Sequence, residues 1–402
     1  MSATPAASAA FGHAVRVGAP NIPDRDRVLD RIAGALSRRT LSNNGPLVRE
    51  FEDRLRRLTG ARHCIAVTNG TVALELAVRA CGLTGEVIVP SFTYVATPHA
   101  LSWQGLTPVF GDVDAYGCLD PDHVRRLVTP RTSGIVGVHL LGTCCDAAGL
   151  EAVAAELGLV LLFDAAHALG SATDGRRVGT LGRAEIFSFH ATKFVNSFEG
   201  GAVATDDDEL AARVRAMRNF GQDDDGVVRS LGTNAKMHEI SAAMGLTAVE
   251  NITGLIAGNE QRHTWYADGL RDLPGIAVRG PRPADASNYS YLSVLVDPAR
   301  AGVTRDEIVR RLAEENVFAK VYFHPGNHRL EPYPQERHRP LPLPRSERLA
   351  EQILVLPNSA DLTADDVGLI CRLIRDLVTR ATGARGEPTS RPTVSVRARE
   401  SS

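Results

Sequence analysis

Few side chains in this sequence could serve as an amine nucleophile. The 402-residue chain has 45 lysines and arginines, but only Lys193, Lys236 and Lys320 are lysines. Arginine stays protonated in proteins, whereas a lysine removed from water can become a neutral amine. The scarcity of lysine reflects a compositional preference for arginine. It nevertheless restricts amine chemistry in this chain to three positions.

Four segments have the residue types that pyridoxal phosphate chemistry requires. Asp164 ends the apolar run Leu161-Leu-Phe-Asp164, and Lys193 closes the segment Ser188-Phe-His-Ala-Thr-Lys193, which Glu199-Gly-Gly201 follows. Thr68-Asn-Gly-Thr71 opens a helical pattern, and an aromatic segment, Pro90-Ser-Phe-Thr-Tyr94, comes after the next apolar run. The cofactor needs a lysine amine for its aldehyde, an acid for its pyridine nitrogen, a helix N-terminus for its phosphate and a ring to stack on it.

This chemistry assigns a role to each segment. The predicted contacts are Lys193 with the aldehyde, Asp164 with the pyridine nitrogen, Gly70, Thr71 and Ser188 with the phosphate, and Tyr94 with the face of the ring. Taken singly, each residue has a structural explanation. A strand-end aspartate often caps a helix, an Asn-Gly-Thr turn often opens one, and His167 and His190 are types that commonly hydrogen-bond within a fold. The order in which they occur together favours function.

The elements that must position these residues alternate between short apolar runs and helical patterns. Strands separated by helices of about 10 to 15 residues are typical of βαβ units and a mostly parallel sheet covered on both faces. We therefore predict an α/β fold with a large parallel-sheet domain. The strands expected in it are 86–89, 107–113, 134–140 and 159–163.

The pattern of expected strands and helices changes after a long helical stretch from about His238 to Leu270. Strands are predicted at 289–296 and 317–323, and capping patterns at Thr304 and Thr363 each open a helix. This predicts a smaller α+β domain. The expected organisation is a flexible N-terminus over residues 1–20, a large domain over 21–255, a small C-terminal domain over 256–380 and a disordered tail over 381–402.

Composition excludes several classes of protein. A formal net charge of −2 lacks the basic excess of a nucleic-acid-binding domain. No apolar run approaches the roughly 20 residues of a membrane helix, and the N-terminus does not resemble a secretion signal. The six cysteines form no CxxC pair and no metal-binding spacing. We expect a cytoplasmic protein without a metal, a nucleic-acid partner or a membrane partner.

The chain resembles the nucleotide-sugar aminotransferases of the DegT/DnrJ/StrS group, which have the aspartate aminotransferase fold (fold type I). The resemblance runs from about Asn43 to Leu377 and is most specific in Ser188–Lys193 with Glu199-Gly-Gly201, and in Gly232-Thr-Asn-Ala-Lys-Met-His-Glu239. It implies that Lys193 holds the cofactor as a Schiff base opposite Asp164. It also implies that Asn234 of the partner subunit completes the phosphate site, and therefore an obligate homodimer with shared active sites.

The resemblance also suggests a substrate. His-Ala-Thr-Lys with Glu-Gly-Gly is similar to family enzymes that act at C-4 of the sugar, and the segment from Tyr322 to Tyr333 is similar to enzymes making dTDP-4-amino-4,6-dideoxyglucose. Those enzymes often have Cys where this chain has Asn327. The expected reactants are L-glutamate and a dTDP-4-keto-6-deoxy-hexose, in deoxyaminosugar and antibiotic biosynthesis. Further expected contacts are His167 and His190 near the cofactor, and Asn43, Asn44, Gly45, Arg229, His324, His328 and Arg329 near the substrate.

Three alternatives remain at this point. A C-3 keto-sugar aminotransferase would share the cofactor site. A non-catalytic regulator that binds the cofactor would need a DNA-binding module, and none is visible. A nicotinamide-dependent oxidoreductase would need Gly-x-Gly-x-x-Gly after its first strand, and the sequence has no such run. A sub-branch of the family replaces the lysine with histidine and performs dehydration, so the intact Lys193 favours transamination.

Overall fold

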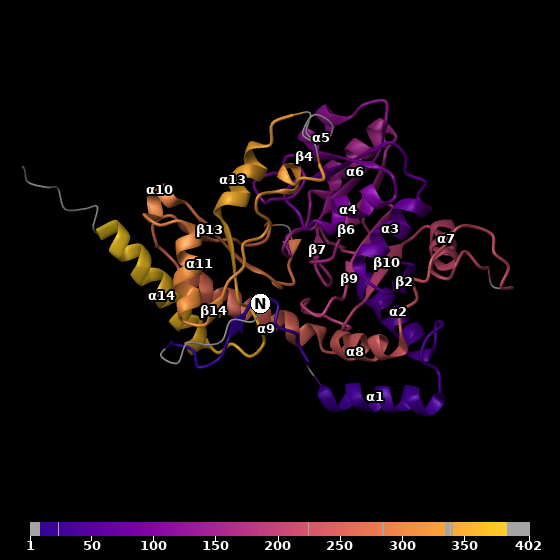
Figure 1. Cartoon of the computed structure of the whole chain (residues 1–402), viewed down its shortest axis with the longest axis horizontal. Helices are drawn as coiled ribbons and strands as arrows, with labels where there is room; N and C mark the ends of the chain where they lie inside the picture. The colour runs from indigo at the N-terminus through magenta and orange to yellow at the C-terminus, as the bar shows by residue number, and fades with distance from the viewer. Residues whose placement is uncertain are drawn as a thin grey trace, which may run out of the picture.

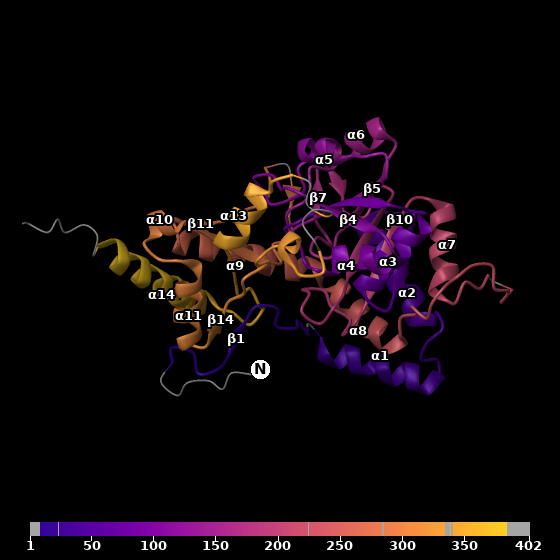
Figure 2. The same cartoon turned by 45° about the horizontal axis from the view of Figure 1, so that its top comes forward.

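The computed structural model describes residues 9–22, 24–223, 225–283, 285–333, 338 and 341–383. It has a large domain built on a seven-stranded sheet and a smaller domain beside it, and helix α9 (Ile252–Gly269) runs between the two (Figures 1 and 2). This arrangement confirms the predicted α/β class with a large, mostly parallel sheet.

The large sheet is parallel except for one strand. Its strand order is β2-β10-β9-β6-β5-β3-β4, and β10 runs antiparallel to both neighbours. The strands are almost entirely buried, as expected for a sheet covered on both faces. The predicted apolar runs correspond to β3, β4, β5 and β6. The bounds are β2 His63–Val67, β3 Glu86–Pro90, β4 Thr107–Gly111, β5 Thr132–Val138, β6 Val160–Asp164, β9 Ala184–Ser188 and β10 Gly201–Thr205.

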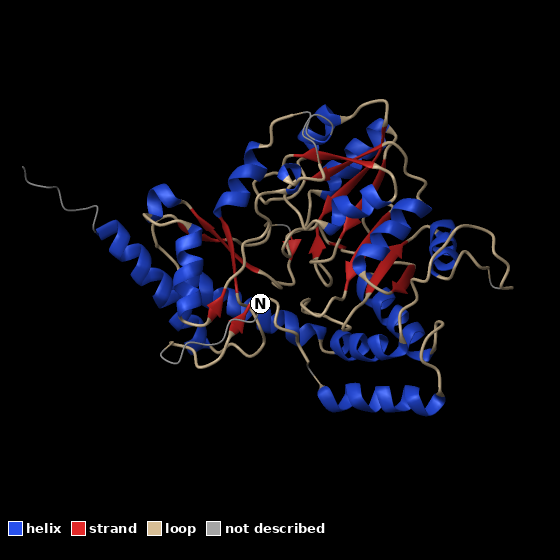
Figure 3. Ribbon diagram, in the orientation of Figure 1, coloured by secondary structure: helices blue, strands red, loops and turns tan. Residues whose placement is uncertain are grey.

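Helices cover both faces of this sheet (Figure 3). One hydrophobic cluster joins the sheet to α3, α4 and α7, and a second joins it to α2, α5, α6 and α8. Helix α1 packs on the outer side of α8. The three layers place the carboxyl ends of the parallel strands at one edge. The bounds are α1 Arg25–Arg38, α2 Pro46–Thr59, α3 Gly70–Ala80, α4 Ala96–Trp103, α5 Pro121–Leu127, α6 Ala147–Leu157, α7 Asp208–Arg218 and α8 Glu239–Glu250.

The small domain has its own sheet and its own core. Strands β11, β13 and β15 form an antiparallel sheet, and α11 and α14 pack against it through a separate apolar cluster. Thr304 makes the predicted capping box with Glu307, and Thr363 pairs in the same way with Asp366. The bounds are β11 Ile276–Val278, β13 Leu292–Val296, β14 Val317–Phe318, β15 Ile353–Leu356, α10 Pro298–Ala301, α11 Arg305–Glu314, η1 Asn327–Arg329, α13 Pro344–Gln352 and α14 Ala364–Gly383.

The chain termini differ from the sequence-based expectation. Residues 1–20 were expected to be flexible, but Val15 and Arg16 form strand β1, which pairs with β14 in parallel. Phe11 and Val15 are buried in the small-domain core, so apolar burial holds this segment in place. At the other end, α14 extends to Gly383, three residues into the predicted tail. Residues 1–8 and 384–402 lie outside the described residues.

The stretch from His238 to Leu270 was predicted as one helix, but it is two. Helices α8 and α9 meet at Asn251 with an angle of 61° between them. Within the described part of the chain, no single helix has the length and hydropathy of a membrane span, and only this bent pair passes when taken together. The strand predicted over 317–323 is also shorter than expected, because regular pairing ends at Phe318.

Candidate active site

A cavity of about 640 Å³ opens where the carboxyl ends of β5, β6 and β9 meet the small domain. The crevice beyond the carboxyl ends of parallel strands is the usual ligand site of open α/β sheets. All the predicted cofactor-binding residues except Asn234 line this cavity. They are Gly70, Thr71, Tyr94, Asp164, His167, Ser188, His190 and Lys193.

Asp164 lies at the end of β6 with 6% of its surface exposed. One carboxylate oxygen, Oδ2, accepts a hydrogen bond of 2.8 Å from the Thr97 hydroxyl. The other, Oδ1, accepts one of 3.0 Å from the backbone N–H of Ala166. Both bonds orient the carboxylate, and each oxygen keeps a further acceptor site. The side chain can therefore receive a protonated ring nitrogen from within the cavity.

The Lys193 amine is held inside the same cavity. Its Nζ donates to the Tyr291 hydroxyl at 3.4 Å, and it lies 5.9 Å from the centre of the Tyr291 ring. Burial lowers the pKa of this amine to about 8, an effect that the negative charge of Asp164 opposes. An amine with this pKa loses its proton closer to neutral pH than an exposed lysine does. A neutral amine can act as a nucleophile and as a general base.

His167 is buried and lines the same cavity as Lys193. Its Nδ1 accepts a hydrogen bond of 3.2 Å from the backbone N–H of Leu141, so in the neutral imidazole the proton is on Nε2. Its ring is 4.7 Å from the Tyr291 ring at an angle of 54°. Burial, and secondly the charge of Lys193, lower the pKa of His167 well below its usual value. The imidazole therefore stays neutral and can offer an Nε2–H donor.

The N-terminus of α3 forms one wall of the cavity. Asn69 caps this helix, since its side chain accepts a 2.9 Å hydrogen bond from the Val72 N–H. The first backbone N–H groups of a helix lack intrahelical acceptors and attract anions. A Cβ on Gly70 would lie 2.8 Å from the Ser188 Cβ, so a glycine allows the start of α3 to approach Ser188 this closely. These features fit the phosphate group of pyridoxal phosphate.

Two predicted residues lie at the rim of the cavity. Tyr94 is 57% exposed, with its ring centre 6.2 Å from that of Phe323. His190 is also exposed, and its Nδ1 lies 2.8 Å from the Thr192 hydroxyl while its Nε2 lies 3.6 Å from the Glu199 carboxylate. Both side chains can therefore contact a ligand that enters from solvent.

Comparison with known proteins decides the class of this site. Residues 24–375 match the model of the DegT/DnrJ/EryC1/StrS aminotransferase family. The chain belongs to this family. The membership confirms the predicted enzyme class, a pyridoxal-phosphate-dependent aminotransferase, and the predicted fold.

Relatives of this aminotransferase are similar over nearly their full length. A dTDP-4-amino-4,6-dideoxy-D-glucose transaminase from Shigella dysenteriae is 33% identical over 359 residues, which cover 89% of this chain and 97% of the relative. A GDP-perosamine synthase from Caulobacter vibrioides is also 33% identical, over 88% of this chain and 95% of the relative. The solved structure of DesI in the presence of its TDP-sugar product is 51% identical, with a TM-score of 0.89 over 94% of this chain and 96% of DesI.

The predicted substrate residues lie outside the cavity of this aminotransferase. Asn43, Arg229 and His324 are exposed, and Arg229 pairs with Asp223 at 2.9 Å. Asn234, predicted to bind the phosphate in the partner subunit, is also exposed. The remaining residues belong to local polar contacts. Gly45 packs against the buried Glu239 carboxylate, Asn44 accepts from Arg49, His328 is buried between Ser91 and Glu347, and Arg329 lies 3.3 Å from Glu347.

The structure adds cavity residues that the sequence analysis did not select. Tyr291, Tyr322 and Phe323 come from the small domain, and Thr97 binds Asp164 from α4. Tyr291 lay in a segment that was interpreted only as a strand, and no local pattern marks it. Long-range packing alone brings it to Lys193.

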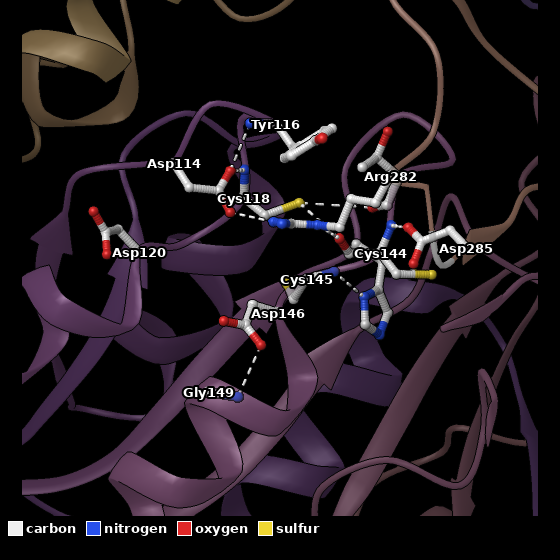
Figure 4. A network of polar contacts seen from close by, with 12 residues as sticks. Asp114, Tyr116, Cys118, Asp120, Cys144, Cys145, Asp146, Gly149, Arg282 and Asp285 are labelled. Atoms are coloured by element: carbon white, nitrogen blue, oxygen red, sulfur yellow. Dashed lines mark hydrogen bonds and ion pairs between the residues drawn. The ribbon is translucent and has the colours of Figure 1, made fainter. Parts of the chain in front are cut away.

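A polar network holds the segment before Tyr291 against the large domain (Figure 4). Arg282 forms an ion pair with Asp114, donates to the Cys144 carbonyl at 2.9 Å and lies 4.4 Å from the centre of the Tyr116 ring. Asp285, in strand β12 (Asp285–Ala286), accepts from the Cys144 N–H. This strand pairs with β7 (Ala172–Thr173), which pairs with β8 (Arg176–Arg177).

The segment continues to the cavity through Asn288. This buried amide donates to the carbonyls of His167 and Leu169, both at 3.0 Å. Tyr291 follows three residues later. The network therefore helps to hold the Tyr291 ring 4.7 Å from the His167 ring, with the Tyr291 hydroxyl 3.4 Å from the Lys193 amine.

Proposed function

We propose that this aminotransferase moves an amino group from L-glutamate to C-4 of a dTDP-4-keto-6-deoxy-hexose and forms dTDP-4-amino-4,6-dideoxyglucose. The observation that carries the proposal is the Lys193 amine, which lies in one cavity with the Asp164 carboxylate and the N-terminus of α3. The substrate assignment is supported by the names of the relatives in Shigella dysenteriae and Escherichia coli and by the TDP-sugar product studied with DesI.

Lys193 would act as both the anchor and the proton carrier. When bound, pyridoxal phosphate supplies an aldehyde that accepts an amino group and a ring that takes up electrons. Lys193 Nζ would hold the aldehyde carbon at rest. Once the amino donor has displaced it, the free amine would take the α-proton of glutamate and return a proton at the neighbouring carbon. A pKa of about 8 suits both directions of this transfer.

Asp164 and its neighbours would hold the ring. The Asp164 carboxylate, oriented by Thr97 and the Ala166 N–H, would bind the protonated pyridine nitrogen. This contact keeps the positive charge that draws electrons into the ring. The neutral His167 lines the same cavity as the carboxylate, and Tyr94 would close the ring face toward solvent.

The phosphate would lie at the N-terminus of α3. The backbone N–H groups of Gly70 and Thr71 and the Ser188 hydroxyl supply donors, and the helix dipole favours negative charge there. His190 would lie at the rim beside it. We further propose that Asn234 of the partner subunit completes this phosphate site, because Asn234 is exposed in its own subunit.

The proposed homodimer fits the exposed apolar surface around Asn234. The loop after α7 projects from the large domain (Figure 1). The exposed large apolar residues there and on α8 are Phe220, Val227, Val228, Leu231 and Ile240. Exposed apolar side chains that occur together on one segment are typical of interaction sites. Arg229 lies on the same loop and would face the nucleotide diphosphate bound by the partner. We also propose that the sugar nucleotide binds near four other residues, which are Asn43, Gly45, His324 and His328.

We propose that this reaction takes place in the cytoplasm. The following assay tests the chemistry of the reaction. The purified chain, loaded with pyridoxal phosphate and L-glutamate, is supplied with dTDP-4-keto-6-deoxyglucose or with its 3-keto isomer. We expect amine formation from the 4-keto sugar alone, with the product identified by mass spectrometry and NMR. Exclusive turnover of the 3-keto isomer would replace the C-4 assignment with C-3. Absence of turnover with both, in a protein that also fails to react with glutamate, would contradict the proposed function.

A further inference from the structure

Residues Val15–Asn21, here called the N-terminal strap, join the small domain to the loop that carries Lys193. At its start, the Val15 N–H donates to the Asn316 carbonyl at 2.9 Å and the Val17 N–H donates to the Phe318 carbonyl at 3.3 Å. The Arg16 guanidinium lies 4.4 Å from the centre of the Phe318 ring. This end of the strap is therefore fixed to β14.

The far end of the strap binds the Lys193 loop through two amide contacts. The Asn21 Nδ2 donates to the Phe194 carbonyl at 3.0 Å. In return, the Asn196 Nδ2 donates to the Asn21 carbonyl at 2.8 Å. Asn196 is only 2% exposed, so its amide is held within the protein. The exchange of hydrogen bonds fixes the backbone immediately after Lys193.

A close packing contact lies on the other side of Lys193. Gly18 has a φ of +78°, and a Cβ built on it would lie 3.0 Å from the Thr192 Cβ. The strap thus contacts Thr192 and Phe194, the residues on either side of Lys193. Residues 189–200 form neither helix nor strand, so this loop depends on such contacts for its shape.

We propose that Asn21 is a positioning residue for the reaction, acting on Lys193 through Phe194 and Asn196. The proposal rests on the function proposed above, in which Lys193 carries the reacting amine. Proton transfer depends on the placement of the reacting atoms, and a misplacement of about 1 Å can reduce a rate on the order of 100-fold. The strap fixes the loop backbone against the small domain, which also supplies Tyr291 to the Lys193 amine.

The test compares Asn21→Asp with Asn251→Asp in the full-length, cofactor-loaded enzyme. Both asparagine amides donate to a backbone carbonyl, and Asn251, which bonds the Thr247 carbonyl at 2.8 Å, lies outside the cavity. An aspartate at position 21 would place an oxygen against the Phe194 carbonyl. Expected for Asn21→Asp are a kcat about tenfold lower with a KM for L-glutamate within about twofold, and faster amide hydrogen exchange in peptides from 190–197. Asn251→Asp should match the wild type in all three measurements.

A second variant, Asn21→Ala, removes the same donor without adding a charge and should show the same two changes, with circular dichroism confirming that each variant is folded. Wild-type kcat and wild-type loop exchange in either folded variant would overturn the proposal. Failure of the underlying function is distinguishable, because it would appear as absence of a cofactor link on Lys193 in the wild type. Amide hydrogen exchange in residues 190–197 can be measured whether or not that link forms.

Discussion

At the scale of single residues, the site is organised around the protonation state of one amine. Lys193 is half-buried in a cavity that Asp164 and Tyr291 also line, and the loss of water around its amine has the larger effect on its pKa. The opposing contribution comes from Asp164. Because these influences act in opposite directions, they can be separated by substitution.

We predict that the Lys193 amine of the cofactor-free protein titrates near pH 8 and is reactive above that pH. Pulse acetylation across a pH series, read by peptide mass spectrometry, should show half-maximal modification of Lys193 near pH 8. Asp164→Asn removes the charge that favours the protonated amine, so the midpoint should move to lower pH.

The same spectra contain their own control. Lys236 and Lys320, the other two lysines of the chain, are modified in the same samples, so a change in reagent or in protein integrity would affect them too. A Lys193 midpoint near the ordinary lysine value of 10.5 would show that burial does not lower its pKa. A shift to higher pH in Asp164→Asn would contradict the proposed effect of the Asp164 charge, which favours the protonated amine.

At the scale of elements, the N-terminus of α3 depends on a glycine. Gly70→Ala would place a methyl group 2.8 Å from the Ser188 Cβ, so the start of α3 and Ser188, both proposed to bind the phosphate, would have to move apart. We expect cofactor affinity to fall by at least about tenfold, which corresponds to the loss of one charge-assisted hydrogen bond. Equilibrium dialysis with pyridoxal phosphate measures this change.

A matched glycine in another helix controls for the effect of substitution on helix stability. Gly254 lies in α9, and a Cβ there has nothing within 4 Å. Gly254→Ala should leave cofactor affinity unchanged and raise the free energy of unfolding by up to about 1 kcal/mol. Equal affinities in the two variants would show that cofactor binding does not depend on the close approach of α3 to Ser188.

The sequence predicted those elements whose signals are local. Thr304 and Thr363 begin helices because their side chains cap the first turn, and the apolar runs ending at Pro90 and Asp164 are buried strands. The break at Asn251 and the short β14 were not predicted, since both follow from packing between distant segments. Val15 joined a strand for the same reason, through its pairing with Val317.

The residues of the site likewise divide into those that the local sequence indicates and those that only long-range packing brings in. Lys193, Asp164 and Gly70 were selected because a lysine, a strand-end acid and a glycine that opens a helix match the needs of pyridoxal phosphate, and the structure brings all three into one cavity. Tyr291 and Thr97 were not selected. Tyr291 reaches the cavity because the nearby Asn288 binds residues about 120 positions earlier in the chain. The role of Thr97 follows only from its hydrogen bond to Asp164, a residue far away in the sequence. Contacts of this kind leave no pattern in the local sequence.

At the scale of the whole molecule, the proposed dimer predicts that two inactive variants restore one another. Lys193→Ala and Asn234→Ala should each lose activity, by on the order of 10³-fold for Lys193→Ala. If Asn234 acts in the partner's site, a mixed dimer has one site carrying both substitutions and one intact site. Random exchange of equal amounts should then restore about a quarter of wild-type activity.

Subunit exchange can be followed by differently tagged chains, with light scattering to establish that the protein is a dimer. Glu239→Ala is unsuitable as a control, because Glu239 accepts hydrogen bonds from the Leu47 and Val48 N–H groups and its loss should destabilise α2. Lys193→Ala mixed with Asp164→Ala is the appropriate control, because both residues lie in the same subunit's cavity. Activity restored in that control mixture, or none restored with Asn234→Ala, would contradict a shared site.

The central claim is that Lys193 holds the cofactor, and borohydride reduction followed by peptide mapping tests it most directly. The cofactor-loaded protein is reduced, digested and sequenced by mass spectrometry, and the three lysines allow only three positions for the label. We predict that the reduced cofactor is found on Lys193 alone and that prior addition of L-glutamate prevents the labelling. Label on Lys236 or Lys320, or none in a protein saturated with pyridoxal phosphate, would contradict the account.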